Sequence, residues 1–126
     1  MTAEIVIAED DETTREAVEF NLTENGWDVV AFTDGDACWE HLGSRTSDTP
    51  DLVVLDVMMP ELDGLSVLER IRNHDALVDL PVVMLTSRNR EEDIVQALDA
   101  GADDFVAKPF SEAELVGRIE VVLDAV

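Results

Sequence analysis

The sequence predicts an α/β fold in which strands and helices alternate around a parallel sheet. Short, almost wholly apolar runs recur along the chain, and helix-like apolar spacing fills the segments between them. Continuous apolar runs, without alternating polar residues, are typical of strands that helices cover on both faces. The one linker-like segment, residues 43–50, is too short to separate two domains. We therefore expect five strand–helix units in a single domain over residues 1–126.

The strands follow from the apolar runs and the helices from their end signals. The expected strands are residues 5–8, 27–32, 52–55, 82–85 and 105–107. The expected helices begin near Thr13 and near residues 34, 64, 91 and 111. Asp28 places a charge in the second strand, so we expect that strand nearer an edge of the sheet.

Helix boundaries are marked by capping residues. Thr13 with Glu16, and Ser111 with Glu114, have the spacing of a capping box, which predicts a helix start at each pair. Gly26, after Asn25, predicts the end of the first helix, and Gly101 predicts the end of the fourth.

Composition limits the classes of function. The 126 residues carry 30 acidic against eight basic side chains, a net charge of -22, which disfavours nucleic acid as a direct ligand. The acids are scattered, and we interpret them as a surface adapted to a salt-rich, halophilic cytoplasm. No apolar run approaches the length of a membrane span or a signal peptide, so we expect a cytoplasmic protein without membrane contact. Cys38 is the single cysteine and cannot form an internal disulfide.

One basic residue stands out. Lys108 is the only lysine in the chain, and it lies in the apolar segment 105–110. A lysine in apolar surroundings is costly unless it is paired, which indicates a specific role for this side chain.

The residues that follow the predicted strands are chemically distinctive. They are Glu9, Asp10 and Asp11 after the first strand, Asp56 after the third, Thr86 and Ser87 after the fourth, and Lys108 after the fifth. Ligands of open α/β sheets bind beyond the carboxyl ends of the strands, so we expect these side chains to converge there.

Their chemistry suits phosphoryl transfer. Glu9, Asp10 and Asp56 offer hard oxygen ligands, and Mg2+ would relieve their mutual repulsion while leaving room for a phosphate oxygen. The carboxylate of Asp56 can then act as a nucleophile that forms an aspartyl-phosphate. Lys108 supplies a cation for a phosphoryl oxygen, and Thr86 supplies a hydroxyl donor for another.

These residues stand in motifs that resemble the receiver domain of two-component response regulators, over essentially the whole chain. The motifs are IVIAEDD at residues 5–11, LDVMMPELDG at 55–64, MLTS at 84–87, AGA at 100–102 and KPF at 108–110. The resemblance implies a doubly wound, flavodoxin-like (βα)5 sandwich with strand order 2-1-3-4-5. It also implies that a histidine kinase or a phosphotransfer protein phosphorylates Asp56, while Glu9 and Asp10 hold Mg2+ directly or through water. Asp11 then starts the first helix.

The resemblance assigns further roles around Asp56. It places the backbone carbonyl of Met58 on the metal, and it makes Met58 and Arg88 modulators of the phosphoryl lifetime. Neither side chain can act as a general base, so we expect a durable phosphoryl group. A loop contact for Met58 and a surface charge for Arg88 are the simpler alternatives.

A switch is implied as well. Thr86 would turn toward the phosphoryl group, which Ser87 leaves room for, and Phe105 would swing inward behind Thr86. Phe105 lacks the tyrosine hydroxyl that many members carry, and it can also be read as an ordinary strand residue. The bond between Lys108 and Pro109 is expected to be cis by the same resemblance.

Partners and alternatives follow from the same comparison. The fourth helix, fifth strand and fifth helix would form the face that meets a downstream protein, with room for a phosphorylation-dependent homodimer. The chain is expected to be a signalling phosphoacceptor and not an enzyme, either standing alone or as part of a longer regulator. A Mg2+-dependent phosphatase that forms an aspartyl-phosphate is one alternative, although Val57, Met58 and Met59 offer no second acid near Asp56. A receiver-like binding module that is never phosphorylated is the other.

Overall fold

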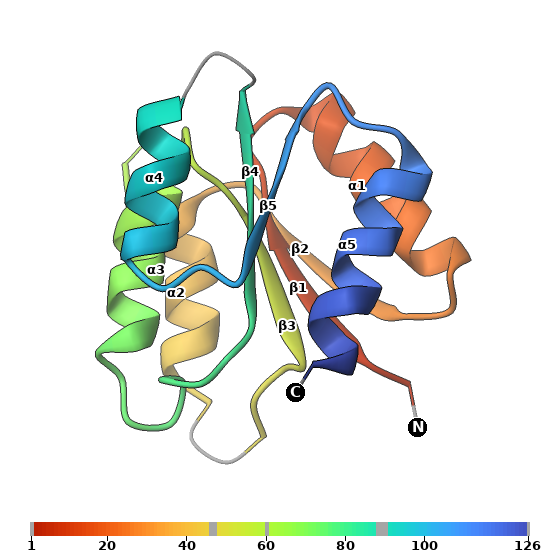
Figure 1. Cartoon of the computed structure of the whole chain (residues 1–126). Coiled ribbons are helices and arrows are strands. Elements are labelled where there is room, and N and C mark those ends of the chain that lie inside the picture. The colour runs from red at the N-terminus through yellow and green to blue at the C-terminus, as the bar shows by residue number, and fades with distance from the viewer. Residues whose placement is uncertain (1, 46–47, 60, 88–90, 126) are drawn as a thin grey trace.

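Strands and helices alternate strictly along the chain in the computed structural model, which describes residues 2–45, 48–59, 61–87 and 91–125. The strands are β1 (Glu4–Ala8), β2 (Asp28–Phe32), β3 (Leu52–Asp56), β4 (Val82–Ser87) and β5 (Asp104–Lys108). The helices are α1 (Glu12–Glu24), α2 (Gly35–Gly43), α3 (Gly64–Arg72), α4 (Glu91–Asp99) and α5 (Glu112–Asp124). The five expected strand–helix units are therefore confirmed (Figure 1).

The strands form one parallel sheet in the order β2-β1-β3-β4-β5, which confirms the expected order. β1 lies between β2 and β3, and its Ile5 pairs with Val29 on one side and Leu52 on the other. β2 is at an edge, as Asp28 indicated, and that aspartate is exposed. The central strand β3 is buried along its whole length, which explains its uninterrupted apolar sequence.

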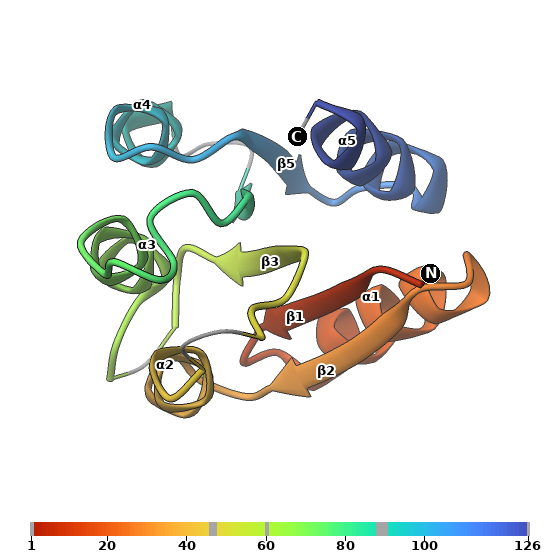
Figure 2. The same ribbon diagram turned by 90° about the horizontal axis from the view of Figure 1, so that it is seen from below.

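The helices cover both faces of the sheet. α1 and α5 lie on one face, and α2, α3 and α4 lie on the other (Figures 1 and 2). Each face has its own buried cluster of side chains. The cluster under α1 and α5 includes Ile5, Ile7, Leu52, Val54, Val83 and Val106 from the strands. The cluster under the other three helices includes Val6, Ala8, Val53, Leu55, Val82 and Met84.

Capping explains where the helices begin. The side chains of Asp34, Asp63 and Ser111 each accept a hydrogen bond from a backbone N–H three residues later, and Ser111 confirms the predicted start of the last helix. The predicted start near Thr13 is wrong. The helix begins at Glu12, because Asp11 is the cap and accepts from Thr14 N at 2.9 Å.

The helix ends predicted at Gly26 and Gly101 are confirmed. Asn25 is the cap at the end of α1, and Gly26 follows with φ of 94°, in the left-handed region that glycine tolerates. Gly101 follows α4 with φ of 104°. Cys38 is a free thiol buried in α2. Within the described parts of the chain, none of the helices has both the length and the apolar character that crossing a membrane requires.

Candidate functional site

The alternation of side chains along the strands brings three charged residues together. Ile7, Val54 and Val106 belong to the buried cluster under α1 and α5. Glu9, Asp56 and Lys108 each follow one of these residues by two positions, so they project toward the same side at the carboxyl ends of β1, β3 and β5. The predicted convergence of these residues at one edge of the sheet is what the structure shows.

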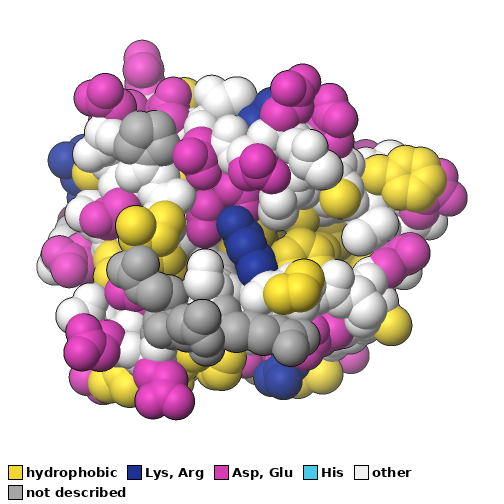
Figure 3. Space-filling view, turned by 90° about the horizontal axis from the view of Figure 1, so that it is seen from above, with side chains coloured by type: hydrophobic (Ala, Val, Ile, Leu, Met, Phe, Trp, Pro, Cys, Tyr) yellow, Lys and Arg dark blue, Asp and Glu magenta, His cyan; other side chains and the backbone are white. Residues whose placement is uncertain are grey.

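Three carboxylates crowd this edge. One oxygen from each of Glu9, Asp10 and Asp56 can be chosen so that all lie within 4.8 Å of one another. Glu9 and Asp56 are buried, whereas Asp10 is exposed. Seen from above, acidic side chains lie along one side of a basic one, and apolar side chains lie on its other side (Figure 3). Clustered oxygen donors of this kind suit a hard divalent cation such as Mg2+.

Lys108 is the cation that faces these acids. Its Nζ lies 2.6 Å from Glu9 Oε1 and 3.3 Å from Asp56 Oδ2, and a quarter of its side chain is exposed. One ammonium group cannot balance three neighbouring carboxylates. The residual negative charge favours a second cation at the site.

The protonation of the two buried acids differs. Burial, together with the adjacent Glu9, raises the pKa of Asp56 to about 7. Burial also disfavours the ionised form of Glu9, but its contacts with Asp56, Lys108 and the backbone of Asp11 outweigh this and lower its pKa. Burial opposes the charge of Lys108, yet Glu9 and Asp56 outweigh it and raise its pKa. Glu9 and Lys108 therefore form the ionised pair when no metal is bound.

Asp11 supports the site from the start of α1. Its backbone N–H donates to Glu9 Oε2 at 3.1 Å, and its carboxylate caps the helix and accepts from the Thr14 hydroxyl at 2.7 Å. Those bonds to Thr14 lower the pKa of Asp11. Asp11 thus starts the helix, as the family resemblance implied.

The loop after β3 is closed tightly around Asp56. Met58 N donates to Asp56 Oδ1 at 3.4 Å, and Gly64 N donates to the carbonyl of Val57 at 3.1 Å. A Cβ added at Gly64 would overlap the backbone carbonyl of Asp56. Only glycine permits this approach. Sequence reasoning missed this role, although Gly64 stands in the motif that carries Asp56.

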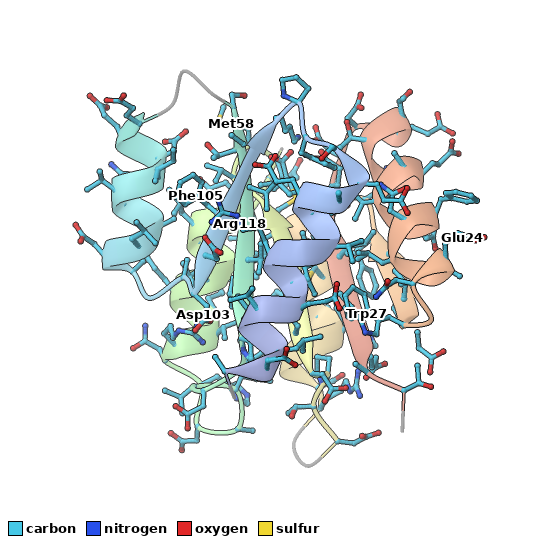
Figure 4. All side chains as sticks on the ribbon, turned by 45° about the vertical axis from the view of Figure 1, so that its right-hand side comes forward. Glu24, Trp27, Met58, Asp103, Phe105 and Arg118 are labelled. Carbon is cyan, nitrogen blue, oxygen red and sulfur yellow. The ribbon has the colours of Figure 1, made fainter. Side chains whose placement is uncertain are left out.

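Met58 lies at the mouth of this loop, near the carboxyl ends of the strands, with about half of its side chain exposed (Figure 4). Arg88, the second predicted modulator of the phosphoryl lifetime, lies outside the described residues.

The two predicted switch residues share one side of the sheet. Thr86 is buried, and its hydroxyl makes a long bond of 3.4 Å to the carbonyl of Ser87. Phe105 pairs with Met84, two residues before Thr86, and is half-buried on the α4 side of β5 (Figure 4). The peptide bond between Lys108 and Pro109 is cis, as expected.

Comparison with known proteins gives consistent matches. The family model of the response regulator receiver domain matches residues 5–120. The transcriptional regulatory protein CseB of Streptomyces coelicolor is 44% identical over 119 residues, which cover 94% of this chain and 48% of that protein. The alkaline phosphatase synthesis transcriptional regulatory protein PhoP of Bacillus subtilis is 37% identical over 98% of this chain and 49% of its own length. The chain thus spans about half the length of these relatives.

Solved structures share the fold closely. A putative response regulator from Chloroflexus aurantiacus is 31% identical with a TM-score of 0.92, covering 98% of this chain and 99% of that one. The receiver domain of the sensor histidine kinase PA1611 from Pseudomonas aeruginosa is 27% identical with a TM-score of 0.87, over 98% and 99% of the two chains. That structure has a magnesium ion coordinated in its active site cleft.

Proposed function

Because this chain belongs to the family of response regulator receiver domains, we propose that Asp56 is its phosphoacceptor and that the added charge switches the contacts of a partner. Its relatives are the phosphoacceptor response regulators of two-component systems. The observation that carries the proposal is the position of Asp56, which is buried beside Glu9 and within 3.3 Å of the sole lysine, Lys108.

The metal site would use the three clustered acids. Glu9, Asp10 and Asp56 would hold Mg2+ together with the backbone carbonyl of Met58, with Glu9 or Asp10 acting directly or through water. Bound there, Mg2+ would neutralise charge on the transferring phosphoryl group and would favour the ionised form of Asp56. The pKa of Asp56 is otherwise raised, and its ionised carboxylate is the nucleophile.

The transfer itself is a displacement at phosphorus. The donor is a phosphohistidine of a sensor histidine kinase or a phosphotransfer protein. A carboxylate oxygen of Asp56 forms the new oxygen–phosphorus bond while the phosphorus–nitrogen bond breaks, and the electron pair of that bond stays on the imidazole nitrogen. Lys108 orients and neutralises a phosphoryl oxygen, and the hydroxyl of Thr86 turns from the carbonyl of Ser87 to donate to another.

The signal to a partner would follow from this rotation of the Thr86 side chain. Movement of Thr86 opens space on the side of the sheet where Phe105 packs, and Phe105 then changes its rotamer. The face formed by α4, β5 and α5 would report the change to a downstream protein or to a second copy of the chain. Glu91, Glu92 and Asp93 make the start of α4 acidic, which favours a partner with basic side chains. The relatives named above include transcriptional regulators, so the partner can be an output region of the same polypeptide.

The phosphoryl group should be lost slowly. Met58 cannot act as a general base for an attacking water, and neither can the predicted second modulator, Arg88. The phosphatase alternative is not favoured either, because it needs a general acid to protonate the leaving group, and residues 57–59 offer none. We accordingly propose a cytoplasmic signalling phosphoacceptor without turnover of small phosphate esters.

The proposal is tested by intact-mass analysis in high salt after incubation with acetyl phosphate, with Mg2+ or with a chelator. A phosphoryl adduct is expected on the wild-type chain with Mg2+ and not with chelator. Asp56→Asn should form no adduct under either condition. An adduct that persists in Asp56→Asn, or that forms equally well without Mg2+, contradicts the proposal.

A further inference from the structure

Arg15 makes contacts that the phosphoacceptor chemistry does not explain. It lies half-buried in the first turns of α1, and its Nη1 donates to the backbone carbonyls of Glu9 at 3.1 Å and of Asp10 at 3.5 Å. These carbonyls belong to two of the three acids that form the carboxylate cluster. Each of the two N–H groups on Nη1 can serve one carbonyl.

Arg72 also donates to backbone carbonyls, those of Gly101, Val78 and Leu80, but Arg15 differs from it in having no carboxylate partner among the described residues. Among the other described arginines, Arg45, Arg72 and Arg118 each contact a carboxylate, on Glu4, Asp103 and Asp104 respectively. The exposed Arg70 forms no ion pair with any residue that the structure describes. Arg15 forms no ion pair with any carboxylate in the described parts of the chain, although 30 acidic residues compete for eight basic ones. Its guanidinium is therefore hydrogen-bonded to the backbone of the acidic segment and is not ion-paired with a carboxylate.

The hydrogen bonds from Arg15 add to other bonds that hold Glu9 and Asp10 in place. Glu9 N donates to the carbonyl of Phe32 at 3.1 Å, which anchors the residue to β2. Glu9 Oε2 accepts from Asp11 N. Arg15 holds the other backbone group of Glu9, its carbonyl, together with the Asp10 carbonyl, so the backbone of both acids is held where β1 leads into α1.

The arrangement also suits the electrostatics of a cation site. A guanidinium that paired with the carboxylates would occupy the oxygens that a metal needs. By bonding to the carbonyls, Arg15 takes up no carboxylate oxygen of Glu9 or Asp10 and still holds their backbone in place. Groups that orient metal ligands in this way strengthen metal binding without touching the ion.

We infer that Arg15 is a positioning residue of the metal site, which holds Glu9 and Asp10 in the geometry that binds a divalent cation. The inference rests on the proposed function, because it assumes that the acidic cluster binds Mg2+. Arg15 follows Asp10 by five residues, so the sequence alone does not single it out.

The test measures Mg2+ binding directly, by calorimetric titration of the unphosphorylated chain in high salt. Arg15→Met removes the guanidinium and keeps an apolar stem. Arg70→Met is the matched control, because Arg70 is an exposed arginine in the last turn of α3, the helix that starts beside the site and runs away from it. Thermal unfolding of each variant in chelator reports separately on stability.

We expect Arg15→Met to weaken the Kd for Mg2+ on the order of tenfold, as loss of an outer-shell partner does, while Arg70→Met stays within about twofold of the wild type. Arg15→Lys, which keeps a charge and N–H donors, should recover part of the loss and leave the Kd about threefold weaker. If Arg15→Met does not fold, the inference is tested by the Kd of Arg15→Lys, and a Kd equal to that of the wild type would contradict it.

Equal Kd values for wild type, Arg15→Met and Arg15→Lys would overturn this inference alone. Absence of Mg2+ binding to the wild-type chain would overturn the metal site of the proposed function, and the inference with it.

Discussion

Lys108 Nζ lies 2.6 Å from Glu9 Oε1, closer than to Asp56 Oδ2 at 3.3 Å, so the sole lysine is anchored mainly by an acid that is not the proposed acceptor. Glu9 is almost fully buried and cannot exchange this partner for water. The lysine is thereby held in place before any phosphoryl group arrives. A charge that is positioned in advance needs little rearrangement during the reaction.

Replacement of Lys108 should slow phosphorylation without abolishing metal binding. Lys108→Met removes the ammonium that would stabilise a phosphoryl oxygen, and we expect adduct formation from acetyl phosphate to slow about 100-fold, as loss of one preorganised donor does. Mg2+ binding should persist, because the three carboxylates remain. Time-resolved intact-mass analysis measures the rate and calorimetry measures the Kd. An unchanged rate would remove Lys108 from the proposed chemistry.

The raised pKa of Asp56 predicts a pH dependence of stability when no metal is present. Burial and Glu9 raise this pKa from 3.8 to about 7. The folded state therefore binds the proton more tightly than the unfolded state does. The resulting stabilisation is fully present below about pH 4 and is lost as the pH rises through about 7.

Asp56→Asn removes this titration and the repulsion from Glu9. In chelator at about pH 8, the variant should exceed the wild type in free energy of unfolding by about 2 kcal/mol. The difference should shrink at low pH and when Mg2+ is added to the wild type. Denaturant unfolding at several pH values measures it. A variant that is less stable than the wild type at every pH would mean that the carboxylates do not repel one another.

Gly64 should tolerate no side chain. A Cβ there would overlap the carbonyl of Asp56, so Gly64→Ala should lower the free energy of unfolding by about 3 kcal/mol. Gly117 is the matched control, since it lies in α5 and a Cβ added there would meet open space. Gly117→Ala should raise the free energy of unfolding by about 0.5 kcal/mol, because alanine is the better helix former. Equal effects of the two substitutions on thermal unfolding would show that the loop after β3 is loosely packed.

Salt should stabilise the fold strongly. With a net charge of -22, self-repulsion acts on the folded chain, and the distance over which charges interact shrinks from about 10 Å at 0.1 M salt to about 3 Å at 1 M. We predict that the melting temperature rises by about 10 °C between these conditions. Calorimetry in KCl measures the shift. A melting temperature independent of salt would refute the interpretation of the surface as halophilic.

The fold was predictable because each structural signal was local. Runs such as residues 5–8 and 52–55 are apolar throughout, which predicts strands. Because side chains alternate between the two faces of a strand, Glu9 and Asp56 then lie on the same face of the sheet. The solitary Lys108 was conspicuous by composition alone. The members of the acidic cluster could thus be predicted from the sequence. That Lys108 lies closer to Glu9 than to Asp56 could not be predicted.

The features that the residue pattern did not predict depend on how closely segments of the backbone approach one another. The capping-box spacing of Thr13 and Glu16 placed the start of α1 two residues late, and only the family resemblance assigned it to Asp11, which is the cap. The roles of Gly64 and Arg15 rest on contacts with backbone carbonyls, which carry no side-chain signature in the sequence.

The most direct test of the central claim is to locate the phosphoryl group on the chain. Borohydride reduces an acyl phosphate to an alcohol, which marks the modified carboxyl stably for peptide mapping by tandem mass spectrometry. After incubation with acetyl phosphate and Mg2+, we predict the mark at Asp56 and nowhere else. A mark at Glu9 or Asp10, or its absence from Asp56, would contradict the assignment of Asp56 as the phosphoacceptor.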